Sequence, residues 1–184
     1  FKRASLLALL VLILLGIAVW PQWFVSGPAK RDDAPTVTLY SANVWVRNAD
    51  VAAIRRSIEA ANPDIVILVE LGRVPSDQLE TLVDGYRFMV TSERDSQRPG
   101  GPRTVIASRY NLVGRVEGDN RLHAIGTTAI TPVGRLHVIA THLTRPWPFQ
   151  FQYGQIIQVE DLTRLHAAMQ ENRPAAAIIA GDFN

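Results

Sequence analysis

A run of five aliphatic residues at positions 65–69 constrains the fold of this 184-residue chain most strongly. The run has the length of a β-strand, follows Asn62-Pro63, and ends directly before Glu70. A strand that is apolar on both sides must be buried on both faces, which requires other layers above and below its sheet. The run therefore predicts a layered α/β fold.

The rest of the chain, from residue 36 onward, alternates strand patterns with helix patterns. One helix is expected to carry an apolar stripe of Ile156, Val159, Leu162, Leu165 and Met169. Short connections favour antiparallel pairing among the strands between residues 104 and 141. Strands are expected over 36–46, 65–69, 86–91, 104–108, 113–117, 122–131, 135–141 and a buried 175–180, with helices over 48–61, 76–83 and 151–172.

Polar residues recur at or just after the carboxyl ends of the apolar strands. They are Asn43, Glu70, His142, Asp182 and Asn184. Such strand ends line ligand-binding crevices in layered α/β folds, so these side chains are expected to converge. Their oxygen atoms suit Mg²⁺ or Mn²⁺, and the absence of cysteine excludes a thiolate site. Taken singly, each residue also fits an ordinary surface, structural or capping role.

The N-terminal part of the chain has a different character. Residues 6–25 contain no charge, and about 20 apolar residues suffice for a helix to cross a bilayer. Trp20 and Trp23 would lie at one interface, although Lys2-Arg3 before the run also fits a cleaved signal peptide. The expected organisation is a transmembrane or signal-anchor segment at 1–26, a linker at 27–35 and a domain at 36–184. The domain is expected to lie outside the cytoplasm.

The net charge of the chain is only +2, and this value does not indicate a nucleic-acid-binding face. No feature points to an obligate protein partner.

Five short motifs, taken together and in this order, resemble the endonuclease/exonuclease/phosphatase superfamily, whose fold is that of deoxyribonuclease I. The resemblance spans residues 36–184. Within the superfamily, the sequence is most similar to bacterial membrane-anchored members. The motifs are Ser41-Ala42-Asn43-Val44, the segment 63–70 ending in Glu70, Ala107-Ser108-Arg109-Tyr110, Ala140-Thr141-His142-Leu143 and Ile179-Ala180-Gly181-Asp182-Phe183-Asn184.

The resemblance implies an α/β (α+β) fold, a four-layer sandwich of two mixed β-sheets flanked by helices. It also implies a divalent-metal-dependent phosphoesterase that uses Mg²⁺ or Mn²⁺. Glu70 would bind the metal with Asn43 close by, while His142 and Asp182 would be catalytic. Asn43 and Asn184 would bind the substrate phosphate, and Asn184 would also be a catalytic residue.

Relatives carry a further acid and an Asp-His pair that this sequence lacks, so the chain is expected to be an N-terminal fragment, truncated at its C-terminus. The expected substrate is a phosphodiester of nucleic acid or phospholipid, or a phosphomonoester. Two alternatives stay open. One is a catalytically inactive, membrane-tethered binding module of the same fold, and the other is an unrelated α/β ligand-binding domain.

Overall fold

The structure is a computed structural model that describes residues 2–23, 33–92, 102–118, 122–145 and 152–184. The chain divides into two compact units, residues 1–34 and 35–184. Most of the expected linker, 27–35, lies outside the described residues.

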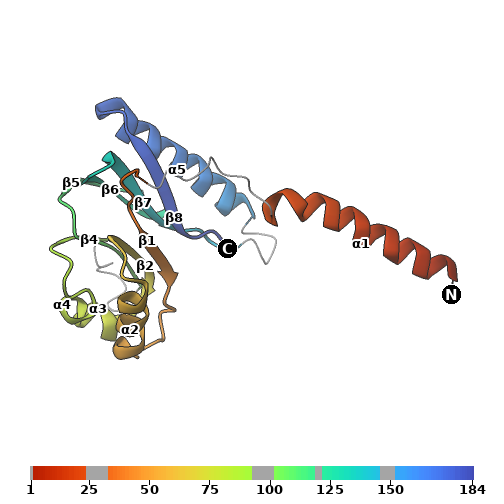
Figure 1. The fold of residues 1–184 in the computed structure, drawn as a ribbon, viewed down its shortest axis with the longest axis horizontal. Helices are drawn as coiled ribbons and strands as arrows, with labels where there is room; N and C mark the ends of the chain where they lie inside the picture. Colours follow the sequence, from red (N-terminus) through yellow and green to blue (C-terminus); the bar gives the residue numbers. More distant parts are fainter. Residues whose placement is uncertain (1, 24–32, 93–101, 119–121, 146–151) are drawn as a thin grey trace. The chain divides into compact units, whose positions relative to one another are not determined.

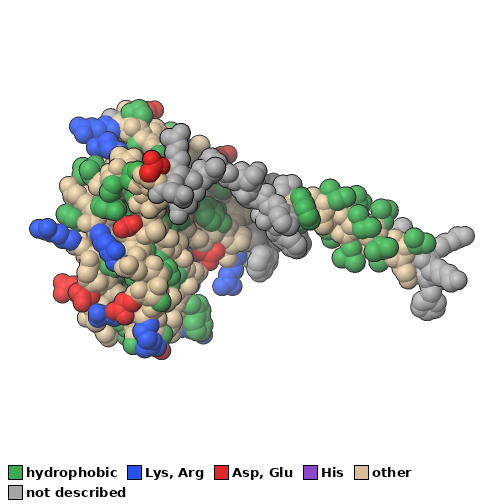
Figure 2. Space-filling view, in the orientation of Figure 1, with side chains coloured by type: hydrophobic (Ala, Val, Ile, Leu, Met, Phe, Trp, Pro, Cys, Tyr) green, Lys and Arg blue, Asp and Glu red, His purple; other side chains and the backbone are tan. Residues whose placement is uncertain are grey.

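The first unit consists of helix α1, Lys2–Trp23. Large apolar side chains from Leu6 to Trp20 are exposed along it, as Figure 2 shows. Among the described residues, no helix reaches the length and apolarity required of a membrane span. The expected transmembrane helix is therefore not confirmed.

The second unit contains two four-stranded sheets (Figure 1). The first sheet has the order β1-β2-β4-β3, in which β1 and β2 are parallel and the other pairs are antiparallel. The second has the order β5-β6-β7-β8, in which only β7 and β8 are parallel. The strands are β1 Leu39–Asn43, β2 Ile65–Leu71, β3 Phe88–Thr91, β4 Arg103–Ser108, β5 Leu112–Glu117, β6 His123–Thr131, β7 Gly134–His142 and β8 Ala176–Asp182.

Helices cover the outer face of each sheet. On the first sheet lie α2 Val51–Ala61, α3 Arg73–Asp77 and α4 Leu79–Leu82, and on the second lies α5 Gln152–Asn172. Asp50 begins α2 by accepting a hydrogen bond from the Ala53 N–H, and Asn62 ends it in the left-handed conformation. The predicted four-layer sandwich of two mixed sheets flanked by helices is confirmed.

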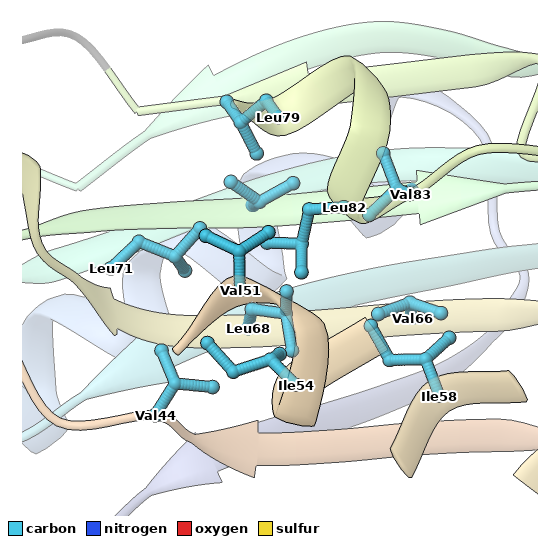
Figure 3. Close-up of a cluster of buried hydrophobic side chains, with 12 residues drawn as sticks. Val44, Val51, Ile54, Ile58, Val66, Leu68, Leu71, Leu79, Leu82 and Val83 are labelled. Carbon is cyan, nitrogen blue, oxygen red and sulfur yellow. The ribbon is translucent and has the colours of Figure 1, made fainter. Parts of the chain in front are cut away.

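Three apolar clusters hold the four layers together. Figure 3 shows the outer cluster, where Val51, Ile54 and Ile58 of α2 point toward Val66 and Leu68 of β2. The alternate residues of β2, at 65, 67 and 69, pack instead against the second sheet. As predicted, the run 65–69 is fully buried, because its two sets of side chains serve two different interfaces.

Two details of the predicted packing are wrong. Strand β8 is partly exposed rather than buried, because it is the last strand of its sheet in the described residues. In α5, Leu162, Leu165 and Met169 are buried, whereas Ile156 and Val159 are exposed. The buried apolar residues of α5 therefore begin only at Leu162, and the buried polar residues Gln158 and Asp161 extend the same face toward the start of the helix.

Asp64 joins the starts of β1 and β2 at the end of the first sheet opposite to Asn43. Its Oδ2 atom accepts hydrogen bonds from the backbone N–H and the hydroxyl of Thr38, at 2.8 and 2.9 Å. Burial alone would raise the pKa of Asp64, but the bonds from Thr38 and Tyr110 and the charge of Arg109 outweigh it, so the pKa lies below its usual value.

Asp64→Ala is expected to lower the free energy of unfolding at pH 7 by about 1–2 kcal/mol, since it leaves the Thr38 N–H without its acceptor. The folded-state pKa is depressed, so this stabilisation is present above the unfolded pKa of about 3.9 and is lost as the pH falls through the folded pKa. Urea unfolding at pH 7 and at pH 3 measures the difference. Asp84→Ala, a change at a mostly exposed carboxylate, serves as the control. An undiminished effect of Asp64→Ala at pH 3 would contradict the assignment.

Candidate active site

Simple strand alternation brings three of the predicted residues to the space between the sheets. On β7, Val138 and Ala140 face the inner cluster, so His142 continues that face. The same alternation carries Asp182 inward at the end of β8 and Asn43 at the end of β1. Strands β1 and β8 lie against each other across the sandwich.

Glu70 reaches the same place only through an irregularity in β2. Regular alternation would turn Glu70 outward with Val66 and Leu68, toward the helices. The pairing of β2 with β4 shifts between Leu68 and Leu71, and Glu70 has φ 58°. Leu71 packs in the outer cluster as a result, and the Glu70 carboxylate turns toward His142. A bulge that re-aims a side chain at a functional site is a recurrent device in β-sheets.

Glu70, His142 and Asp182 form one cluster, with one ligand atom from each lying within 4.8 Å of the others. The Nε2 atom of His142 lies 3.0 Å from Glu70 Oε1 and 3.9 Å from Asp182 Oδ2. All three side chains are partly exposed, so solvent reaches them. The structure thus brings together residues that are 72 and 40 positions apart in sequence.

The two asparagines hold the Asp182 carboxylate from both sides. The Asn43 side-chain N–H donates to Oδ2 at 2.6 Å, and the Asn184 backbone N–H donates to Oδ1 at 2.8 Å. The Asn43 side-chain oxygen accepts from the Trp45 N–H, while the Asn184 side chain donates to the Leu143 carbonyl. Both asparagines therefore lie at the site, with their side chains already hydrogen-bonded inside the protein.

These contacts set the charge of Asp182. Burial by itself would raise the pKa of its carboxyl group, but the hydrogen bonds from Asn184 and Asn43 and the charges of His142 and Arg145 outweigh burial. The net effect is a pKa below the usual range, so Asp182 is ionised at neutral pH.

Gly181 allows β7 and β8 to approach closely enough to align the cluster. It has φ 143°, and a Cβ atom there would lie 1.8 Å from the Thr141 carbonyl oxygen. The two strands pair in parallel with His142 opposite Asp182. Helix α5 supports both strand ends, because the side chain of Gln155 donates to the Phe183 carbonyl and that of Gln158 pairs with Thr144.

Three further residues at the site were missed by sequence reasoning. His123 lies directly opposite His142 in the β6–β7 pairing, so the two residues share one face. Arg145 acts electrostatically on Asp182, and Trp45 hydrogen-bonds to Asn43. Trp45 and Arg145 have a signal in the sequence, since they follow the predicted site residues Asn43 and His142 by two and three positions.

Comparison with solved structures shows the same fold in several proteins. An endonuclease/exonuclease/phosphatase from Beutenbergia cavernae superposes with a TM-score of 0.59 at 22% identity, over 80% of this chain and 47% of that one. TDP2 from D. rerio, complexed with a single-strand DNA product, superposes with a TM-score of 0.61 at 15% identity, over 80% of this chain and 60% of that one. The human Nocturnin catalytic domain superposes with a TM-score of 0.62 at 16% identity, over 80% of this chain and 64% of that one.

The chain spans about half to two thirds of the length of these structural relatives. No curated protein matches its sequence. The family model described as "Endonuclease/Exonuclease/phosphatase family" matches residues 40–184, which include every predicted site residue. With two mixed sheets that carry this cluster at one end of the sandwich, the chain belongs to the endonuclease/exonuclease/phosphatase family.

Proposed function

We propose that the protein is a divalent-metal-dependent phosphoesterase that hydrolyses a phosphodiester or a phosphomonoester. The observation that carries the proposal is the convergence of Glu70, His142 and Asp182 within 4.8 Å in a member of this family. Five dispersed polar residues meet at one end of the sandwich, at strand ends of the kind that commonly line ligand-binding crevices in α/β folds.

The donor set fits a hard cation. Glu70 and Asp182 present two carboxylates, and Mg²⁺ typically takes only one or two from a protein while it keeps several waters. Without cysteine and with one imidazole in the cluster, the site matches Mg²⁺ or Mn²⁺ better than structural zinc. Glu70 is the proposed principal ligand, with Asn43 close to the metal. When bound, the cation would supply Lewis-acid stabilisation of charge on phosphate oxygens.

The residues of the chain have separate parts in the proposed reaction. Asp182, with its pKa held below the usual range, accepts a hydrogen bond from the attacking water and orients it for in-line attack. His142 faces both carboxylates and presents its imidazole to the phosphate as a hydrogen-bond donor. Asn43 and Asn184 keep Asp182 in place and contribute amide groups for phosphate oxygens.

The proposal is tested by assaying the full-length protein against a bis-aryl phosphodiester, DNA, RNA and phospholipid vesicles. We expect hydrolysis with Mg²⁺ or Mn²⁺ that stops with a chelator and returns when metal is added in excess. Isothermal titration with each metal gives an independent readout. Metal binding without hydrolysis of any substrate would favour the alternative, an inactive binding module, whereas neither binding nor hydrolysis would remove the proposal.

We also propose that α1 attaches the protein to a bacterial membrane, with the globular unit outside the cytoplasm. Support comes from the uncharged run 6–25 and its exposed apolar side chains. The full-length protein is expected to sediment with membranes after carbonate extraction, and deletion of residues 1–26 should release it. Protease added to intact spheroplasts should digest the globular unit. Recovery of the intact protein in the soluble fraction would contradict attachment.

A further inference from the structure

Backbone strain among the described residues is concentrated at the candidate active site. Four described residues other than glycine have positive φ values, and Asn62 is accounted for as the residue that ends α2. The other three are Glu70 at 58°, Asn184 at 48° and Trp45 at 59°. Glu70 and Asn184 belong to the site, and strained conformations of this kind cluster at active sites.

Trp45 is the least expected of the three. A left-handed conformation is rare for a bulky side chain and costs roughly 1–2 kcal/mol relative to glycine. Burial does not offset this cost, because the side chain is 58% exposed. The strain therefore maintains a large aromatic ring in solvent beside the site.

The backbone around Trp45 is fixed on both sides. Its N–H donates to the Asn43 side chain at 2.9 Å, and its carbonyl accepts from the Asn48 N–H at 2.8 Å. Val44 before it is buried and bonds to Val69 of β2. The loop thus presents the indole from a rigid support, next to an asparagine that holds Asp182.

Cationic residues lie close to Trp45 along the backbone. Arg47 follows two positions later, and Arg73 follows Gly72, where an added Cβ atom would lie 1.9 Å from the Val46 carbonyl oxygen. Both arginine residues are exposed, with Asp77 3.7 Å from Arg73, and Arg145, which follows β7, acts electrostatically on Asp182. Proteins that bind single-stranded nucleic acid combine aromatic rings that stack on bases with arginines that contact the backbone.

We propose that Trp45 determines substrate specificity by stacking on a nucleobase adjacent to the scissile phosphate. The substrate class is then a single-stranded, base-bearing phosphodiester. This inference rests on the proposed phosphoesterase function, and it assigns Trp45 a contact with the substrate but none with the metal.

Binding of a fluorescein-labelled oligothymidylate to the full-length protein in EDTA tests the contact without metal or turnover. Trp45→Ala is expected to weaken binding about 10- to 100-fold, and Trp45→Phe less than fivefold, since a ring is retained. Trp20→Ala, which removes an exposed tryptophan of α1, is the matched control and should bind like the wild type. Unchanged binding by Trp45→Ala, or no micromolar binding by the wild type, overturns the inference.

A second variant separates a substrate role from a structural one. Asparagine tolerates the left-handed conformation, so Trp45→Asn is expected to keep or raise the melting temperature while it loses oligonucleotide affinity. A lowered melting temperature with unchanged affinity would assign Trp45 to packing.

Kinetics with metal complete the test. In Trp45→Ala, kcat/KM should fall 10- to 100-fold for a dinucleotide and stay within threefold for the same phosphodiester with abasic sugars. An effect confined to phospholipid vesicles would overturn the inference in favour of membrane contact. Absence of all hydrolysis by the wild type would instead count against the proposed function, while the EDTA binding result would still decide the role of Trp45.

Discussion

Glu70→Gln in the full-length protein is expected to lower kcat for phosphodiester hydrolysis by about 10³-fold or more. The substitution keeps the size of the side chain and an oxygen that can accept from His142, 3.0 Å away, but removes the negative charge. The fold should be retained, because glutamine has nearly the same shape as glutamate and fits the same position in β2. Titration calorimetry should show the affinity for Mg²⁺ or Mn²⁺ reduced in parallel.

Glu59→Gln is the matched control, because Glu59 lies on α2 and pairs with Arg55 on the surface. Its kinetics should equal those of the wild type. Glu70→Gly adds a check on strain, since glycine accepts φ 58° without steric strain, and should be inactive yet melt no lower than Glu70→Gln. Activity of Glu70→Gln within tenfold of the wild type would show that the carboxylate is not the principal metal ligand.

Alternation of apolar and polar residues made most of the site predictable. His142 and Asp182 continue the inner faces of β7 and β8, so identifying those strands already determines which way they point. Asn43 follows the same rule on β1. The motifs that resemble the family then linked the strand ends, which lie far apart in sequence.

Glu70 shows where such reasoning stops. Alternation within 65–69 would direct the Glu70 side chain outward. Its inward direction depends on a bulge that no residue pattern in 65–71 predicts. His123 was missed for a similar reason, because its place opposite His142 depends on the register of β6 and β7. The exposure of Ile156, Val159 and β8 likewise depends on which neighbours cover them, which periodicity alone does not specify.

Gly181→Ala is expected to destabilise the second unit by more than about 4 kcal/mol, because a backbone clash and an unfavourable φ act at one position. The new Cβ would lie 1.8 Å from the Thr141 carbonyl oxygen, and φ 143° is rarely adopted by residues that carry a Cβ. Relief of the clash must move β8 away from β7, which displaces Asp182 from His142. Metal affinity should therefore fall even in protein that remains folded at low temperature.

Substitutions at two other glycines separate the effect of the backbone clash from the effect of the unfavourable φ. Gly134→Ala meets nothing within 4 Å but has φ 105°, so it should cost only about 1–2 kcal/mol. Gly72→Ala has an ordinary φ of −71° but places a Cβ 1.9 Å from the Val46 carbonyl oxygen, so its cost should lie between the other two. Thermal and urea unfolding monitored by circular dichroism should show destabilisation that increases from Gly134→Ala through Gly72→Ala to Gly181→Ala. A Gly181→Ala variant no less stable than Gly134→Ala would mean that β7 and β8 do not need this close approach, and the alignment of Asp182 with His142 would then require another cause.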